Sequence, residues 1–473
     1  MLFQSWEYFL LLCVTILIIR ISPNNTLRKA VILFNSLLFY AYGGGWQILL
    51  FGAIIISAYI NGILLSKTKN RLLFSAMLLI LFSPLFIYKY IPFLLIEFCG
   101  TAAEGITGNL ILPIGISFYT FQAVGYVIDV YRGQTVAERD LLTFSCFISF
   151  FPQLVAGPIE RSGNLIHQIE QFTNPTEEDY SIGFRHILLG LTLKLLIAET
   201  MAELVDPVYN NLNGKGGLAV LIATFCFGIQ IYCDFNGYTQ IAIGSAKIMG
   251  IDLMQNFNHP YRAGTVTDFW RRWHISLTSW FRDYVYFPLG GSRCSKRKML
   301  RNTIIVFLLS GIWHGANWTF ALWGLFNGIA MATEKLINPH KKVHGFFNWL
   351  VTYIIINLFW VLFRANSLRD AGLAYYLIFT DTLPQLLSLN SMSAIMNFLL
   401  RENGWSNSVL LPLIASAGVY LIYEYGYLIR MELTELLHSS NNKVRWIIYM
   451  ILIMITLYLG KTLQQSAFVY FRF

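Results

Sequence analysis

The most regular feature of the sequence is a series of long apolar stretches separated by short charged loops. Residues 1–19 carry a single charge, Glu7, and residues 31–66 contain no Asp, Glu, Lys or Arg. At about 1.5 Å per residue, one helix over 31–66 would be longer than the ~30 Å hydrocarbon core of a bilayer. The run Gly43-Gly44-Gly45 predicts a break, so this stretch is expected to form a helical hairpin.

Further apolar stretches follow along the rest of the chain. They lie at about 71–97, 105–128, 141–159, 183–205, 216–248, 302–333, 343–363, 403–430 and 446–460. Together with the first stretch, 4–21, they predict an all-α polytopic membrane protein with about eleven transmembrane helices. No soluble domain of any size fits between them. The chain 1–473 is therefore expected to form one membrane-integral domain.

The charges of the loops predict an orientation. Basic residues dominate the loops near 20–29 and 67–71, whereas the loop 97–109 is acidic. Basic loops face the cytoplasm, which places the N-terminus outside. A secretory signal would carry its positive charge before the apolar stretch, but here the charge follows it, so 4–21 is expected to stay as a span.

The segment 254–301 departs from this pattern because it is aromatic, basic and too polar to span. The sequence from Thr265 to Asp268 resembles a helix-capping box. Apolar residues then recur at helical spacing, at Trp270, Trp273, Leu277, Phe281 and Tyr284. We therefore expect an amphipathic helix that lies in the membrane interface or re-enters the protein interior.

Composition agrees with a membrane protein. Hydrophobic residues make up 56% of the chain and charged residues 12%, against about 25% in soluble proteins. The net charge of +9 is expected to lie mainly in cytoplasmic loops, and no nucleic-acid-binding motif is present. No metal site is predicted, because the six cysteines form no CxxC pair and no other metal-ligand spacing occurs.

The strongest chemical signal is His314, which lies inside the uncharged stretch 302–333. An ionisable side chain at that depth is costly to bury and is a candidate functional residue by default. Gly311 and Gly315 stand on either side of it and would let another helix or a ligand approach the backbone. Histidine can accept and donate a proton near neutral pH. The structural alternative is a neutral histidine hydrogen-bonded across a helix interface.

His274, in the segment 270–284, is the second candidate. If the amphipathic helix forms the wall of a cavity, His274 faces His314. If the helix lies in the interface instead, its Trp and Tyr side chains sit at the level of the lipid headgroups and its arginines meet lipid phosphates. The sequence leaves both arrangements open.

Other polar residues are candidates for substrate binding. The basic cluster from Arg293 to Arg301, which includes Lys296, would suit the phosphates of a cytosolic donor, although it also fits an ordinary cytoplasmic loop. Asp234 follows an uncharged run and precedes an Asn-Gly break. The remaining candidates are Arg282, Trp313 and Asn317.

Several motifs together resemble one family. They are Trp270-Arg-Arg-Trp-His274, Phe281-Arg-Asp-Tyr-Val-Tyr286, Pro288-Leu-Gly-Gly291 and Trp313-His-Gly-Ala-Asn-Trp318. They resemble the bacterial branch of the membrane-bound O-acyltransferases (MBOAT), in particular the alginate O-acetyltransferase type. The Pro-Leu-Gly-Gly block favours this type over the related teichoic acid D-alanyl transferases. One departure is Asn236, where the resemblance predicts serine.

The resemblance implies a fold and an activity. The fold would be a ring of about eleven helices, with re-entrant and amphipathic helices around a central funnel. His314 would be the essential histidine and His274 the second histidine. The donor would be cytosolic acetyl-CoA, with no tightly bound cofactor. The acceptor would lie outside the cytoplasm. It would be either a hydroxyl group of a cell-surface or secreted polysaccharide, such as an alginate-like exopolysaccharide, or an acetyltransferase partner of the serine-hydrolase kind that completes the transfer. The location would be the inner membrane of a bacterium.

Alternatives remain at this stage. D-alanyl transfer to teichoic acid and acylation of a lipid rather than a polymer are the enzymatic alternatives. A transporter for lipid-linked sugars is the non-enzymatic one, because polar residues within spans also suit proton-coupled transport. Inverted repeats with paired broken helices would favour a transporter, and none are evident in the sequence. The sequence also leaves open whether the acyl group moves directly to the acceptor or rests first on a protein side chain.

Overall fold

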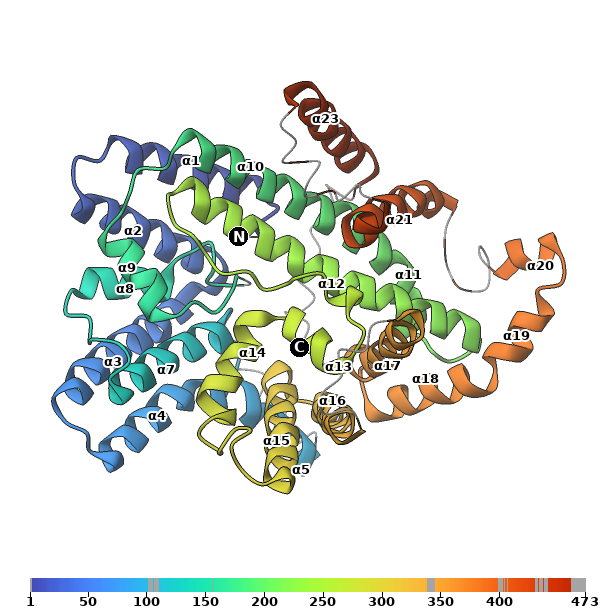
Figure 1. Cartoon of the computed structure of the whole chain (residues 1–473), viewed down its shortest axis with the longest axis horizontal. Coiled ribbons are helices and arrows are strands. Elements are labelled where there is room, and N and C mark those ends of the chain that lie inside the picture. Colours follow the sequence, from blue (N-terminus) through green and yellow to red (C-terminus); the bar gives the residue numbers. More distant parts are fainter. Residues whose placement is uncertain are drawn as a thin grey trace. The chain divides into compact units, whose positions relative to one another are not determined.

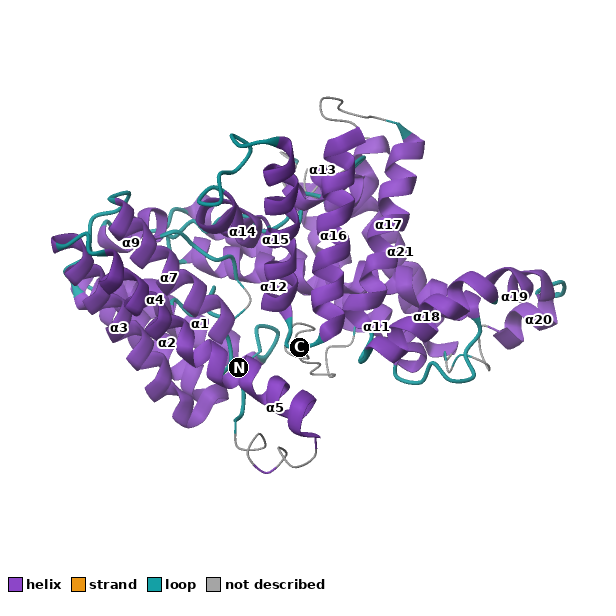
Figure 2. Ribbon diagram, turned by 90° about the horizontal axis from the view of Figure 1, so that it is seen from below, coloured by secondary structure: helices purple, strands orange, loops and turns teal. Residues whose placement is uncertain are grey.

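In the computed structural model, the described part of the chain consists of helices joined by loops (Figure 2). The structure describes residues 2–100, 105, 110–155, 157–337, 345–398, 403, 405, 407–429, 433, 437 and 441–460, and no strand occurs among them. Five helical stretches in this part are long and apolar enough to cross a membrane: Asn25–Lys67, Arg71–Cys99, Gly217–Ile248, Phe346–Arg364 and Asn442–Leu459. The all-α membrane class is thereby confirmed. The number of spans and their arrangement in a ring stay predictions.

The chain divides into two compact units, and Figure 1 labels their helices. Unit 1 consists of Met1–Ile187, Tyr238–Asn256 and Ser279–Val285. Unit 2 consists of Leu188–Gly237, Phe257–Thr278 and Tyr286–Phe473. The division falls within three helices, α10 (Glu177–Leu191), α12 (Gly217–Ile248) and α14 (Ile275–Phe281).

Unit 1 begins with long apolar helices. Its complete helices are α1 (Trp6–Ile21), α2 (Asn25–Gly44), α3 (Ile48–Lys67), α4 (Arg71–Leu85), α5 (Ile91–Cys99), α7 (Ile116–Arg132), α8 (Leu141–Ser149) and α9 (Ser162–Glu170). Polar residues cap the starts of α1, α2 and α4, because the side chains of Ser5, Asn24 and Asn70 accept hydrogen bonds from backbone N–H groups of the first turn. The predicted hairpin break is confirmed, since α2 ends at Gly44 and Gly45 has φ of 52°.

An ion pair joins the first part of α2 to the residue that caps α8. Lys29 Nζ lies 2.8 Å from Asp140 Oδ2, and Thr143 Oγ1 donates a hydrogen bond to the same carboxylate. Partial burial acts to raise the pKa of Asp140, but the hydrogen bonds from Lys29 and Thr143 outweigh it and lower this pKa to about 2. Asp140 therefore carries its charge at neutral pH and holds the start of α8 against Lys29.

Three apolar stretches differ from the prediction. The stretch 141–159 is helical only as far as Ser149, because Pro152 and Pro158 lack the N–H groups that a helix needs. The helix in 105–128 begins at Ile116, and residues 106–109 lie outside the described residues. The stretch 302–333 is not one span but two helices joined at a turn.

Unit 2 contains the C-terminal helices. They are α11 (Glu199–Tyr209), α13 (Val266–Arg272), α15 (Lys296–His314), α16 (Trp318–Ile337), α17 (Phe346–Arg364), α18 (Leu368–Thr380), α19 (Thr382–Ser388), α20 (Met392–Asn397), α21 (Leu410–Tyr425) and α23 (Asn442–Leu459). A π-helical segment, Thr192–Ala198, joins α10 to α11, and a 3₁₀ turn, Pro260–Arg262, precedes α13.

The atypical segment 254–301 is helical, as predicted, but it is broken. The side chain of Thr265 accepts a hydrogen bond from the backbone N–H of Asp268, which confirms the predicted cap of α13. The chain then leaves the helix at Trp273 and His274, and α14 begins at Ile275. The prediction of one continuous helix was therefore wrong. Its predicted apolar stripe is buried nonetheless, each side chain being at most 9% exposed: Trp270, Trp273, Leu277, Phe281 and Tyr284.

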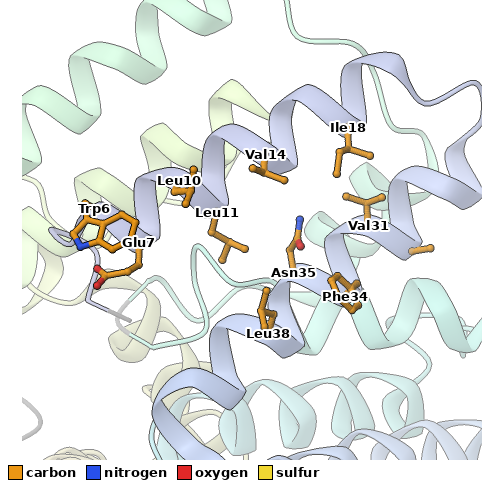
Figure 3. A pocket seen from close by; sticks show the side chains of 11 residues that line it. Trp6, Glu7, Leu10, Leu11, Val14, Ile18, Val31, Phe34, Asn35 and Leu38 are labelled. Atoms are coloured by element: carbon orange, nitrogen blue, oxygen red, sulfur yellow. The ribbon is translucent and has the colours of Figure 1, made fainter.

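A groove of about 610 Å³ lies between α1 and α2 within unit 1 (Figure 3). Apolar side chains line most of it, with Trp6 and Glu7 at one end. Asn35 also lines it and donates a hydrogen bond to Thr15 Oγ1 at 2.8 Å. None of the candidate site residues predicted from the sequence borders this groove.

Candidate active site

The hairpin of α15 and α16 positions the main candidate, and the two helices lie side by side in both ribbon views (Figures 1 and 2). A Cβ atom on Gly311 would overlap the carbonyl oxygen of Phe320 and would lie 3.0 Å from the Cα atom of Gly324. Only glycine allows backbones to approach so closely. The role predicted for Gly311, to let another helix approach, is confirmed.

The hairpin turns directly after His314. α15 ends at this residue, and Gly315 takes an extended conformation with φ of −157°. The Oδ1 atom of Asn317 accepts a hydrogen bond at 3.0 Å from the backbone N–H of Thr319, close to the start of α16. His314 therefore projects from the last residue of a helix whose position is fixed by the neighbouring helix.

The imidazole ring of His314 lies among aromatic rings of unit 2. Its centroid is 5.0 Å from that of Trp313, 5.2 Å from that of Trp323 and 5.3 Å from that of Phe363. The residue is 5% exposed. Edge-to-face contacts of this kind fix the orientation of a ring without consuming its nitrogen atoms.

His274 lies beside His314, which is the cavity-wall arrangement of the two that the sequence left open. The centroids of the two imidazole rings are 6.3 Å apart, and His274 is 2% exposed. The ring of Phe235 contacts His274 edge-on at 4.7 Å. His274 has φ of 42°, in the left-handed region that costs a non-glycine residue about 1–2 kcal/mol. The break between α13 and α14 therefore directs this side chain at a conformational cost.

Trp313 and Asn317, the two candidates close to His314 in the sequence, have different surroundings in the structure. Trp313 is 4% exposed, and its ring lies beside both imidazoles, 5.0 Å from His314 and 6.1 Å from His274. Asn317 is partly exposed, and its Nδ2 atom donates to the backbone oxygen of Asn366 at 3.1 Å. Trp313 thus belongs to the group around the histidines, whereas Asn317 holds the turn after α15.

Asp234 belongs to a buried charged group in unit 2 that the sequence did not connect. Lys194 Nζ lies 2.7 Å from Asp234 Oδ1 and 2.6 Å from Glu199 Oε1, and all three side chains are at most 5% exposed. A buried charge without a partner is costly, which explains why these side chains come together. Asp234 is thus bound by a protein cation, and its neighbour Phe235 contacts His274.

The three basic candidates do not gather within one unit. Arg282 lies in unit 1, where its Nε atom donates to Asp283 Oδ1 at 2.8 Å and its side chain is 57% exposed. Arg293 and Lys296 lie in unit 2, exposed, in the loop before α15 and at its first residue. The latter two form a basic surface at the start of the helix that ends at His314.

Sequence reasoning missed one buried pair. His259 Nδ1 lies 3.0 Å from Glu424 Oε2, and the carboxylate is fully buried. Both residues are in unit 2, at the turn before α13 and near the end of α21. A lone carboxylate within the apolar stretch 403–430 is the signal that would have identified Glu424.

Among the described residues, no three His, Cys, Asp or Glu side chains are grouped as metal ligands. The side chains in contact with His314 are aromatic, among them the imidazole of His274 and the indoles of Trp313 and Trp323. A neutral imidazole offers one hydrogen-bond donor and one acceptor, so two adjacent imidazoles can hold a hydroxyl group and a carbonyl oxygen at once.

Comparison with known proteins identifies relatives over most of the chain. Residues 136–366, which include every candidate site residue predicted above, match the MBOAT, membrane-bound O-acyltransferase family. The chain is 36% identical over 403 residues to the probable alginate O-acetylase AlgI of Pseudomonas aeruginosa, covering 82% of this chain and 77% of the relative.

Two other relatives carry different names. The peptidoglycan O-acetyltransferase of Helicobacter pylori is 32% identical over 390 residues, which is 74% of this chain and 73% of the relative. The teichoic acid D-alanyltransferase of Bacillus subtilis is 29% identical over 321 residues, which is 64% of this chain and 76% of the relative.

Proposed function

Because the chain belongs to the membrane-bound O-acyltransferase family and is an O-acyltransferase, we propose that it moves an acetyl group from cytosolic acetyl-CoA to a hydroxyl group of an extracytoplasmic polysaccharide. Its identity to an alginate O-acetylase and a peptidoglycan O-acetyltransferase, 36% and 32%, supports an acetyl group and a polysaccharide acceptor. Family membership favours an enzyme over the transporter considered from the sequence.

The observation that carries the proposal is the pair of buried imidazoles, His314 and His274, with ring centroids 6.3 Å apart. Ionisable side chains are costly in a membrane-embedded interior and are kept there for chemistry or transport. Aromatic rings fix their orientation, as a site that positions two reacting groups requires.

In the proposed mechanism, His314 is the general base. Its unprotonated ring nitrogen takes the proton of the acceptor hydroxyl as the oxygen attacks the thioester carbonyl. His274 donates a hydrogen bond to the carbonyl oxygen as charge develops on it. The tetrahedral intermediate then expels the CoA thiolate, which takes the proton back from His314. An ester bond forms, a thioester bond breaks, and no proton is gained or lost overall.

The proposal also places the donor and the acceptor on opposite sides of the membrane. The chain is an integral membrane protein, and we place it in the inner membrane of a bacterium. CoA is too large and too highly charged to cross lipid, whereas an acetyl group is small and neutral. The basic surface around Arg293 and Lys296 receives the phosphates of CoA on the cytosolic side. The acceptor hydroxyl of the His314 step belongs to an extracytoplasmic acetyltransferase partner, which then transfers the acetyl group from its own ester to a hydroxyl group of the polymer.

The experiment compares two acyl donors in membranes from cells that express the chain and make the polymer. Labelled acetyl-CoA is supplied in one sample, and labelled D-alanine with ATP in the other. We expect base-labile labelled ester on the polymer from acetyl-CoA alone. Incorporation of D-alanine without acetyl would contradict the proposal and favour the activity named for the Bacillus subtilis relative.

A further inference from the structure

Glu424, near the end of α21, is a fully buried carboxylate with two hydrogen-bond donors on one oxygen. His259 Nδ1 donates to Oε2 at 3.0 Å, and the hydroxyl group of Tyr232 donates to the same atom at 3.2 Å. The other oxygen, Oε1, has no hydrogen-bond partner among the described residues. Glu424 thus ties together α12, α21 and the turn before α13, all within unit 2.

His259, the hydrogen-bond partner of Glu424, has an unusual backbone conformation. In the part of the chain that is described, His259 and His274 are the two non-glycine residues with positive φ, at 45° and 42°. Surrounding contacts must hold such a conformation, because an L side chain rarely adopts it alone. For His259 these contacts include Glu424 at its side chain. Arg262, three residues on, donates to the backbone oxygen atoms of Glu424 and Tyr423.

The turn at His259 is hydrogen-bonded to the end of α13, two residues before His274. The backbone N–H of Asn258 donates to the backbone oxygen of Arg272 at 3.0 Å. Phe257 precedes Asn258 in the sequence, and Trp273 follows Arg272. The rings of these two residues pack edge to face, with centroids 5.1 Å apart. A shift of the turn at His259 therefore reaches the backbone directly before His274.

α12 provides a second connection. The ring of Tyr232, whose hydroxyl group donates to Glu424, also contacts the ring of Trp273 at 5.9 Å. Phe235 lies about one helical turn further along the same helix and contacts His274 at 4.7 Å. Glu424 is thus linked to Trp273 and His274, the two residues of the bend, both through the turn at His259 and through α12.

From these contacts we propose that Glu424 is a positioning residue for acyl transfer. Its hydrogen bonds to His259 and Tyr232 hold the turn and helix face that set the orientation of the His274 ring toward His314. The inference rests on the proposed function, since it concerns how the pair of histidines is aligned. Glu424 lies outside the range 136–366 that matches the family, so nothing in that match assigns it a role.

A carboxylate at this position costs more free energy to bury than an apolar side chain of similar size. Its contribution is geometric rather than stabilising, because a carboxylate oxygen can accept from two donors at once. An amide oxygen can do the same, whereas a methyl group cannot. The substitutions Glu424→Gln and Glu424→Ala therefore separate the hydrogen bonds from the charge.

The test measures acetyl transfer in membranes that contain equal amounts of each variant, together with thermal stability in detergent. For Glu424→Ala we expect about tenfold lower kcat with a KM for acetyl-CoA within about twofold of wild type. Glu424→Gln should keep at least about half of the wild-type kcat. A matched control is Tyr420→Phe, one turn earlier on α21, because the hydroxyl group of Tyr420 has no hydrogen-bond partner among the described residues. It should behave as wild type.

A second pair of variants tests the hydrogen bond between His259 and Glu424 by changing His259. Asparagine tolerates the left-handed backbone, and its Nδ2 atom can donate from nearly the place of His259 Nδ1. His259→Asn should therefore retain activity that His259→Ala loses, with kcat rather than KM changed. This pair keeps the proposal testable if Glu424→Ala does not accumulate in membranes.

Failure of the positioning role can be distinguished from failure of the proposed function. If wild type and Tyr420→Phe transfer acetyl equally and Glu424→Ala matches them, the positioning role is wrong and the proposed function stands. If Glu424→Gln falls as far as Glu424→Ala, hydrogen-bond geometry is not what this position supplies, and the inference is overturned. If wild type transfers no acetyl group, the proposed function itself fails.

Discussion

Replacing His314 by alanine should abolish acetylation of the polymer while the protein remains folded in the membrane. The side chain lies at the end of α15 and contacts aromatic rings, whereas the hairpin is held by Gly311 and Gly324. Losing the general base should lower the transfer rate by about 10²–10⁴-fold, which is enough to remove detectable ester from the polymer. The measurement is the O-acetyl content of the polymer at matched amounts of membrane protein.

A second histidine provides the control for this substitution. His186 Nδ1 lies 2.6 Å from Gln240 Oε1 in unit 1 and has no part in the proposed mechanism. His186→Ala should therefore leave polymer acetylation largely intact. Near-normal acetylation by His314→Ala, at the same protein level, would remove His314 from the mechanism.

The second large effect concerns folding, and we expect Gly311→Leu to deplete the folded protein. A Cβ atom at this position would overlap a backbone oxygen of α16, which cannot move aside as a flexible side chain can. Forcing the two helices apart should cost about 3 kcal/mol or more. The yield of protein from membranes and its thermal midpoint in detergent measure this loss.

Gly372 in α18 is the matched control, because a Cβ atom there would meet nothing within 4 Å. Gly372→Leu should accumulate and melt like wild type, since leucine favours a helix more than glycine does. If Gly311→Leu melts with the wild type instead, close packing of α15 on α16 does not determine the position of His314.

The features that sequence predicted correctly are local ones. The break after Gly44, the cap at Thr265 and the close approach at Gly311 each follow from the chemistry of one residue and its neighbours. The catalytic candidates were found in the same way, because one histidine in an uncharged stretch is visible without knowledge of the fold. That His274 faces His314 was one of two arrangements that the sequence left open, and the structure has this one.

The features that sequence missed depend on distant partners or on backbone geometry. Asp234 on α12 is distant in sequence from Lys194 and Glu199, and its pairing with Lys194 is visible only in the folded chain. Glu424 and His259 are separated in the same way. Apolar residues continued at helical spacing through the bend at His274, so side-chain periodicity alone indicated one helix where the backbone makes two.

The most direct test of transmembrane acetyl transfer through His314 uses inside-out membrane vesicles from cells that make the polymer. The lumen of these vesicles encloses the acceptor and any extracytoplasmic partner, and labelled acetyl-CoA is added outside. We predict labelled ester inside the vesicles with the wild-type chain, and none with His314→Ala. Label that stays outside with the wild type, or an equal amount inside with both chains, would contradict the account.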